Sequence, residues 1–246
     1  DGDIIFVIAG MGGGTGTGSA PVIAKYAKET DAVVVGVAIL PFKEEGLPRR
    51  KVALEGLAEL KKNCDCVIEL DNEKLNELTG GDYPIQKAFG VMSDLVSGIV
   101  QSLSEVVTEP SMINVDFADL KKIIEAGGMA KVLYGESDGS DPGSVLDSVL
   151  GNPLLGNNYK GAEAVLLHIA AGSEFAMSDC HEVLSALKYD LAEDANLIWG
   201  LRTDDSMSTK VKVVMLVSAI PESEHDLSTK AEDELNSIGS SLPMIN

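Results

Sequence analysis

A glycine-rich stretch, MGGGTGTGSAP at 11–21, stands between the apolar run IIFVIAG and the helix-like segment VIAKYAKET. Glycine backbone lets several N–H groups converge on one anion, and a helix N-terminus behind it adds about half a unit of positive charge. The threonine hydroxyls can add further donors. The stretch therefore predicts a phosphate site, and the alternative is a flexible turn. The candidate positions are Gly12, Gly13, Gly14, Thr15, Gly16, Thr17 and Gly18.

Two common phosphate-binding patterns do not match this stretch. The P-loop pattern needs a lysine, and the stretch contains none. A G-x-G-x-x-G pattern that starts at Gly12 needs glycine where Thr17 stands. A phosphate loop at this place is therefore of another type.

The segments around the loop alternate between strand and helix patterns. Strands are expected at 4–10, 32–41 and 66–70, and helices at 19–30, with Ser19 as N-cap and Pro21 in the first turn, and at 49–62. The strands are almost continuously apolar, which is typical of a parallel sheet covered on both faces. This order predicts an α/β layer with right-handed crossovers.

A long helix is expected next, followed by a second α/β region. Apolar residues recur at helical spacing over 84–108, a length of about 37 Å, so this helix is predicted to be buried between two bodies, with Pro110 ending it. Strands are expected at 129–135, 162–172, 195–202 and 210–220, and helices at 117–125, 143–150 and 178–191. They predict a mixed or antiparallel sheet with helices on one face. From Pro221 the chain is polar and acidic, as in a solvated helix or tail.

The motif GGGTGTG resembles the glycine-rich nucleotide loop of the tubulin/FtsZ superfamily of GTPases, and the FtsZ branch is the closer match. Four more motifs follow in family order: LPFKEEG with Arg49 resembles the loop that reaches the nucleotide, DNEKL the ribose and guanine contact, KAFGVMSDL the start of the central helix, and INVDFADL the synergy loop. The resemblance implies a partial Rossmann-like parallel-sheet GTPase domain with the central helix at 1–109. It also implies a smaller α/β domain with a mixed sheet at 110–220 and an acidic tail at 221–246.

The resemblance also implies roles for residues beyond the glycine loop. Glu45 and Arg49 match nucleotide-contact positions, although an ordinary i, i+4 surface pair gives the same spacing, and Arg50 could exchange roles with Arg49. Asn72 follows a predicted strand and matches a ribose or base contact, with a turn-forming asparagine as the alternative.

Phe89 matches a residue that stacks on guanine, and the alternative is a core aromatic of the long helix. One turn later the family usually has Asn or Asp, whereas this sequence has Ser93 followed by Asp94. Either Asp94 substitutes, or guanine is held more loosely.

Asn114, Asp116 and Asp119 are the catalytic candidates. By their spacing, Asp116 and Asp119 share one face at a helix start, where carboxylates also serve as ordinary caps. The resemblance implies instead that this loop inserts into the nucleotide site of the next subunit and orients the water that attacks the γ-phosphate. Hydrolysis would then require head-to-tail assembly.

Two competing motifs predict other chemistry. Gly135–Gly139 fits the G-x-S-x-G elbow of serine hydrolases, but a polar segment delays the next helix, and His168, His181 and His225 offer no assigned partner. Cys64 and Cys66 could hold a metal, but no second ligand pair has matching spacing, so no metal site is expected.

The composition of the chain limits the classes of partner that it can bind. A net charge of −20 argues against nucleic acid and anionic membranes, because phosphate surfaces attract Lys and Arg clusters. No apolar run reaches the roughly 18 residues of a membrane span. Three cysteines without a disulfide framework suggest a reducing compartment.

Together the residues and the resemblance predict a cytoplasmic GTPase that binds GTP and GDP with Mg²⁺ and polymerises head-to-tail at the division site. Membrane-tethering or division proteins could bind the tail. The alternative is a non-hydrolysing structural or regulatory relative. An archaeal source is favoured. The family's first segment, of about a hundred residues, is expected to be missing, so this chain alone should bind GTP weakly or not at all and expose a sheet edge.

Overall fold

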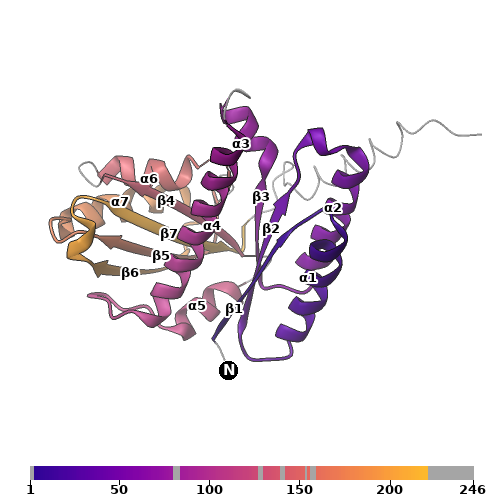
Figure 1. The fold of residues 1–246 in the computed structure, drawn as a ribbon. Coiled ribbons are helices and arrows are strands. Elements are labelled where there is room, and N and C mark those ends of the chain that lie inside the picture. Colours follow the sequence, from indigo (N-terminus) through magenta and orange to yellow (C-terminus); the bar gives the residue numbers. More distant parts are fainter. Residues whose placement is uncertain are drawn as a thin grey trace, which may run out of the picture.

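A three-stranded parallel sheet and a four-stranded mixed sheet lie on either side of one long helix (Figure 1). The computed structural model describes residues 3–79, 84–126, 130–138, 142–152, 154–155 and 159–220. The predicted tail at 221–246 lies outside the described residues. Within the described part, no helix is both long and apolar enough to cross a bilayer.

The first sheet has the strand order β1-β2-β3, and all its strands are parallel. The strands are β1 Ile4–Gly10, β2 Val33–Leu40 and β3 Cys66–Asp71; the connecting elements are α1 Gly14–Ala27, the 3-10 turn η1 Lys43–Glu45, α2 Leu47–Lys61 and α3 Asn72–Thr79. Helices α1 and α2 pack on one face of the sheet, and α4 covers the other. This double coverage explains why the strands are apolar on both faces.

Helix α1 begins five residues before the predicted N-cap. Gly13 is the N-cap, with φ −99° and ψ 172°, so most of the glycine stretch is helical. Ser19 lies inside the helix and donates its hydroxyl to the Thr15 carbonyl, 2.7 Å away, and Pro21 is buried in the helix interior. Packing against β1 outweighs the poor helix propensity of glycine: a Cβ on Gly16 would lie 2.2 Å from the Gly10 carbonyl oxygen.

Helix α4, Ile85–Thr108, is the central helix that the sequence predicts. Its stripe of buried apolar side chains packs against β2 and β3 on one side and against the second sheet on the other. The stripe consists of Met92, Leu95, Ile99, Leu103 and Val106. Its burial fixes the two sheets to each other through one continuous core.

The second sheet has the strand order β4-β7-β5-β6, with β5 and β6 parallel and the other pairs antiparallel. Its strands are β4 Lys131–Ser137, β5 Ala164–Ala171, β6 Asn196–Thr203 and β7 Val211–Ser218; its helices are α5 Phe117–Ile124, α6 Pro142–Leu150 and α7 Met177–Asp190, with the 3-10 turn η2 Asp205–Met207. The mixed sheet is confirmed.

The prediction that helices cover only one face of this sheet is wrong. Helices α6 and α7 pack on one face, against side chains such as Leu167 and Met215. Helices α4 and α5 pack on the other face, against Leu166 and Leu216. Strand β5 is buried along its whole length, so neither of its faces can be left to solvent.

Candidate functional site

The turn between β1 and α1 requires glycine at position 12. Gly12 has φ +92°, and a Cβ there would lie 2.7 Å from Arg49 Cγ and 2.9 Å from the Arg49 carbonyl oxygen. Its N–H donates to Thr17 Oγ1 across 2.8 Å. The turn therefore folds back onto α1 and lies directly against the side chain of Arg49.

The N-terminus of α1 is open. No described side chain caps it, and a Cβ built on Gly13 or Gly14 would meet no described atom within 4 Å. Thr15 is exposed beside them. The first N–H groups of a helix have no partner inside the helix, so this end offers several backbone donors and the positive end of the helix dipole to an anion.

Thr17 packs against α2, whereas Thr15 is exposed. Its methyl group faces Gly56 of α2, where a Cβ would lie 2.2 Å from Thr17 Cγ2. Its hydroxyl oxygen already accepts the Gly12 N–H. Thr17 therefore supports the loop and the contact between α1 and α2, and Thr15 is the hydroxyl that faces outward.

Glu45 and Arg49 form an ion pair with 3.0 Å between Oε2 and Nη1. The other oxygen, Glu45 Oε1, accepts the Phe42 N–H at 3.0 Å. Arg49 keeps half of its side chain exposed beside the glycine loop. Arg50 instead forms two hydrogen bonds to Asp71 and one to the Pro41 carbonyl, which disfavours an exchange of roles with Arg49.

The residues expected to hold the sugar and the base lie at the same end of the sheet. Asn72 follows β3 directly and is 6% exposed. Phe89 is 51% exposed and meets Phe42 edge-to-face with 6.0 Å between ring centroids, so it is not a core aromatic. The Ser93 hydroxyl donates to the Phe89 carbonyl at 2.9 Å, and Asp94 is exposed.

The carboxylates of the predicted synergy loop cap α5. Asp116 Oδ1 accepts the Asp119 N–H at 2.8 Å, and Asp119 Oδ2 accepts the Asp116 N–H at 3.3 Å. Asn114 Oδ1 accepts the Ser111 N–H at 2.9 Å. The capping interpretation of this spacing is therefore correct as local structure. Each carboxylate uses only one of its two oxygens in the capping box. The box therefore fixes both side chains and leaves the second oxygen of each outside it.

The segment before α5 lies on the edge of β6. Ile113 and Leu201 exchange two backbone hydrogen bonds of 3.1 Å, and Val115 is buried. Asn114 and Asp116 are exposed. The alternation apolar-polar-apolar-polar over 113–116 is the signal that sequence reasoning missed, because a strand-like segment of this length was not expected there.

The two candidate regions lie at opposite ends of the molecule (Figure 1). Phe89 stands near the first residue of α4 and contacts Phe42, which follows the carboxyl end of β2. The segment 110–116 begins where α4 ends. A helix of 24 residues is about 36 Å long, so one molecule cannot bring Asp116 to its own glycine loop.

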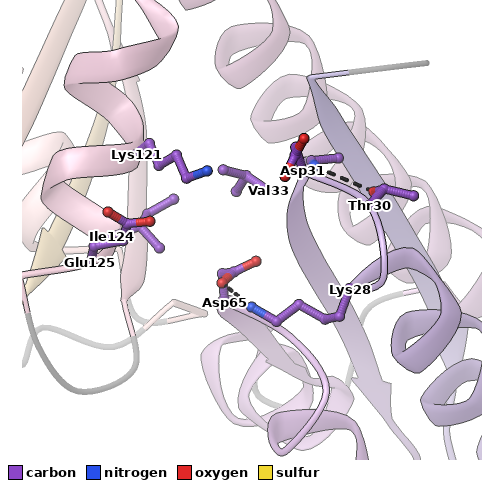
Figure 2. A pocket seen from close by; sticks show the side chains of 9 residues that line it. Lys28, Thr30, Asp31, Val33, Asp65, Lys121, Ile124 and Glu125 are labelled. Carbon is purple, nitrogen blue, oxygen red and sulfur yellow. Dashed lines mark hydrogen bonds and ion pairs between the residues drawn. The ribbon is translucent and has the colours of Figure 1, made fainter.

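A cavity of about 150 Å³ lies between α5 and the amino ends of β2 and β3 (Figure 2). Lys28 and Asp65 form an ion pair at its rim, and Lys121 reaches across it toward Val33. None of the predicted site residues lines this cavity, which is at the sheet end opposite to the glycine loop.

Within the described residues, the competing motifs do not assemble into active sites; Gly139 and His225 lie outside them. Ser137 ends β4, and its buried hydroxyl has no hydrogen-bond partner among the described residues, whereas a nucleophilic serine needs a base. Cys64 and Cys66 are buried thiols, and burial raises the pKa of Cys64 to about 12 and that of Cys66 further. The described part contains no group of three His, Cys, Asp or Glu side chains that could hold a metal ion.

Two family models match the chain. Residues 1–80 match the GTPase domain of the tubulin/FtsZ family, and residues 128–221 match the C-terminal domain of the FtsZ family. Among curated proteins, cell division protein FtsZ 2 of Methanocaldococcus jannaschii is 41% identical over 222 residues, which are 89% of this chain and 58% of the relative. Its counterpart in Haloferax volcanii is 41% identical over 221 residues, with 89% and 55% covered. The chain thus spans little more than half the length of these relatives.

The comparison with solved structures also finds similarity to FtsZ. An empty FtsZ dimer of M. jannaschii matches with a TM-score of 0.80 and 36% identity, over 90% of this chain and 64% of that one. A CetZ of Methanosaeta thermophila matches with a TM-score of 0.78 over 98% of this chain and 66% of that one, but at 20% identity this shows the fold alone. By its two family models, its identity to the archaeal relatives and its fold, the chain belongs to the FtsZ family.

Proposed function

We propose that this protein is a GTPase that polymerises head-to-tail and hydrolyses GTP at the junction between subunits. The observation that carries the proposal is the separation of two half-sites by the length of α4. An open, uncapped helix N-terminus with Arg49 lies at one end, and the exposed side chains of Asn114 and Asp116 lie at the other. Two half-sites at opposite ends of one molecule form a whole site only in a head-to-tail contact, which repeats into a filament unless it closes into a ring.

The first half-site suits the phosphates of GTP and GDP. The N–H groups at the start of α1, together with the Thr15 hydroxyl and the Arg49 guanidinium, supply donors and positive charge. The exposed Phe89 and the half-buried Phe42 offer an aromatic surface for the base, and Asn72 stands at the carboxyl end of β3 for the ribose. The Ser93 hydroxyl is engaged with its own helix backbone, so the exposed Asp94 carboxylate is the proposed partner of the guanine ring.

Mg²⁺ is proposed to accompany the nucleotide. Mg²⁺ commonly keeps several waters and is held by substrate phosphates with one or two carboxylates, so it needs no protein cage. The described residues, which contain no three-ligand cluster, are compatible with this arrangement. The ion supplies charge neutralisation at the phosphates when it is bound.

The second half-site positions the attacking water. The water oxygen bonds to the γ-phosphorus, the bond from that phosphorus to the bridging oxygen breaks, and GDP leaves with its electron pair. One proton of the water stays on the phosphate product and the other passes to solvent. Asp116, Asp119 and Asn114 orient this water and accept its hydrogen bonds. Phosphoryl transfer depends on positioning and charge placement, and the capping box supplies rigid carboxylates at little conformational cost.

In the cell, we propose a cytoplasmic filament at the division site, with the first functional domain at 1–109 and the second at 110–220. A dimer among the solved relatives supports self-association. The acidic segment 221–246 is proposed as the part that binds tethering or division proteins.

A non-hydrolysing filament protein is the second candidate. It is favoured by one observation: Asp116 and Asp119 already have a structural role in capping α5, so their presence does not require catalysis. GTP turnover separates the two candidates, because a non-hydrolysing relative binds nucleotide and assembles without releasing phosphate.

The test is phosphate release by the full-length protein with GTP and Mg²⁺ over a range of protein concentrations. The proposal predicts turnover only above a threshold concentration, at which light scattering reports assembly, and its loss in an Asp116→Ala variant that still binds GTP. Turnover that is strictly proportional to concentration and indifferent to Asp116 contradicts it.

A further inference from the structure

We infer that Arg202 and Glu105 form a positioning pair that holds the segment 110–116 in the geometry needed for hydrolysis; this inference rests on the proposed function. Neither residue lies in the glycine loop or in the synergy motif. They act through the backbone of the segment, which they fix from two sides.

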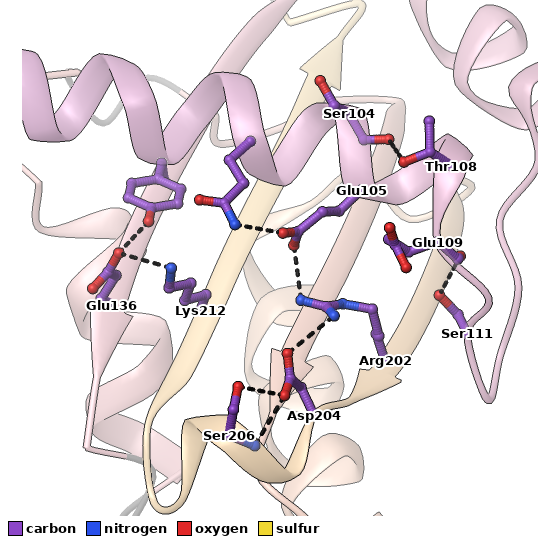
Figure 3. Close-up of polar contacts among 12 residues, drawn as sticks. Ser104, Glu105, Thr108, Glu109, Ser111, Glu136, Arg202, Asp204, Ser206 and Lys212 are labelled. Atoms are coloured by element: carbon purple, nitrogen blue, oxygen red, sulfur yellow. Dashed lines mark hydrogen bonds and ion pairs between the residues drawn. The ribbon is translucent and has the colours of Figure 1, made fainter.

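The pair joins α4 to β6. Arg202 Nη2 lies 2.9 Å from Glu105 Oε2, and the two side chains are only 15% and 16% exposed (Figure 3). Arg202 Nη1 lies 3.2 Å from Asp204 Oδ2, so the guanidinium stands between two carboxylates. Glu105 Oε1 accepts a hydrogen bond of 2.7 Å from Gln101. Both oxygens of Glu105 are thus engaged, which gives the contact one defined orientation.

Each partner stands next to one anchor of the segment. Glu105 lies in the last turn of α4, and its carbonyl accepts the Glu109 N–H at 3.0 Å, where the segment starts. Arg202 directly follows Leu201, which exchanges two hydrogen bonds with Ile113. The ion pair therefore links the start of the segment to its docking point on β6, although the two residues are 97 positions apart.

The docking point is closely packed. A Cβ on Gly200 would lie 2.7 Å from Val115 Cγ2 and 3.0 Å from the Ile113 carbonyl oxygen. A small rotation of β6 against α4 would therefore move Ile113 and Val115, and with them the outward-facing Asn114 and Asp116. A displacement of about 1 Å can cost roughly a hundredfold in rate when a group must orient a reactant.

The ion pair of Arg202 and Glu105 is better explained by its fixing the orientation of β6 on α4 than by its contribution to stability. Arg202 Nε is buried without a hydrogen-bond partner among the described residues, and so is His168 Nε2 in the neighbouring strand. Buried ion pairs are weak stabilisers because desolvation offsets their attraction, and an unpaired donor adds to the penalty. Apolar side chains would pack here without that cost, but they would not fix one orientation.

A second ion pair on the same sheet, which is longer and more exposed than the first, provides a control. Lys212 Nζ of β7 lies 3.8 Å from Glu136 Oε1 of β4, and Glu136 bonds Tyr134, which packs against Gly98 in the middle of α4. Through Tyr134 this pair also links the second sheet to α4, but its described hydrogen bond and ion pair do not involve the segment 110–116.

The test compares Arg202→Gln, Glu105→Gln, their double variant and Arg202→Lys with the control Lys212→Gln in the full-length protein. Two quantities are measured: hydrogen exchange of the Ile113 and Leu201 amides in unassembled protein, and kcat and KM for GTP in assembled protein. Each Gln variant should speed exchange at both amides by about tenfold and lower kcat by about tenfold, with KM changed less than about twofold.

The double variant should be no worse than either single variant, because the two residues form one interaction, and Arg202→Lys should recover part of the loss. Unchanged exchange at Ile113 in the Gln variants, or an equal loss in Lys212→Gln, would overturn the inference. Exchange at Ile113 does not depend on GTP hydrolysis, whereas the Asp116→Ala variant tests the proposed function itself. The two can therefore fail separately.

Discussion

The guanidinium of Arg50 binds the Asp71 carboxylate at two points, with Nη1–Oδ1 and Nη2–Oδ2 distances of 3.0 and 2.7 Å. This contact ties the start of α2 to the last residue of β3, and Asp71 Oδ1 also accepts the Glu73 N–H. Arg50 also donates to the Pro41 carbonyl just after β2. The carboxyl ends of β2 and β3 and the start of α2 are thereby held in one arrangement. The neighbouring Arg49 pairs with Glu45 instead and lies against the glycine loop.

Substitution of the two adjacent arginines should therefore have different effects: Arg50 should matter for stability and Arg49 for GTP binding. Arg50→Gln leaves the Asp71 charge nearly buried without its partner and should lower the free energy of unfolding by about 3 kcal/mol. Arg49→Gln removes a half-exposed pair and should change it by less than about 0.5 kcal/mol, yet weaken GTP binding about tenfold. Denaturant unfolding and calorimetric titration with GTP measure both quantities. Equal losses of stability would contradict this assignment.

Gly14 offers a test of the phosphate site that spares the fold. Because a Cβ there meets no described atom within 4 Å, Gly14→Glu should fold normally and gain about 0.5 kcal/mol from a carboxylate at the helix N-terminus. The same charge should repel the nucleotide phosphates and weaken GTP binding by at least about a hundredfold. Gly14→Gln has nearly the same size without the charge and serves as the control. Equal affinity in the two variants would place the phosphates elsewhere.

Capping and catalysis by Asp116 can be separated by two substitutions. Asparagine caps helices about as well as aspartate, so Asp116→Asn should keep the free energy of unfolding within about 0.5 kcal/mol, while Asp116→Ala should lose about 1 kcal/mol. Both should reduce GTP turnover in assembled protein by about a hundredfold or more. An Asn variant with full turnover would show that the side chain acts only as a cap.

His168 should make stability depend on pH. Burial, with a smaller contribution from Arg202, lowers the pKa of this 2% exposed side chain to about 4, against about 6.5 in the unfolded chain. As pH falls from 6.5 to 4 the unfolded state binds the proton and the folded state does not, so unfolding becomes easier by up to about 3 kcal/mol. His168→Asn should flatten this part of the stability curve. Parallel curves for the two proteins would contradict the assignment.

The sequence predicted the regular elements where one strong pattern dominated. The apolar stripe of 84–108 and the near-continuous apolar strands at 4–10 and 66–70 correspond to α4, β1 and β3. The start of α1 could not be predicted in this way, because glycine has the weakest helix propensity apart from proline, and Ser19 with Pro21 imitates a later start. Only the close approach of Gly16 to Gly10 explains the earlier start, and that contact is tertiary.

In the candidate site too, contacts within a short segment could be predicted from the sequence, whereas contacts between distant segments could not. Spacing alone predicted the cap formed by Asp116 and Asp119, since capping is local. The contact of Arg49 with Gly12, the ring contact of Phe42 with Phe89 and the pairing of Ile113 with Leu201 join distant segments. A pattern along one chain carries no direct signal for such contacts. The burial of α4 between two bodies was predicted, but the cover that α5 adds to the same face of the second sheet was missed for this reason.

The most direct test of a site shared between subunits mixes two inactive variants of the full-length protein. According to the proposal, Gly14→Glu keeps the loop with Asp116 but no longer binds nucleotide, and Asp116→Ala still binds nucleotide but lacks the carboxylate. If the site is shared, an equimolar mixture should release phosphate well above the sum of the separate variants, because one junction joins the intact halves. A mixture that releases no more phosphate than that sum would contradict a site formed between two molecules.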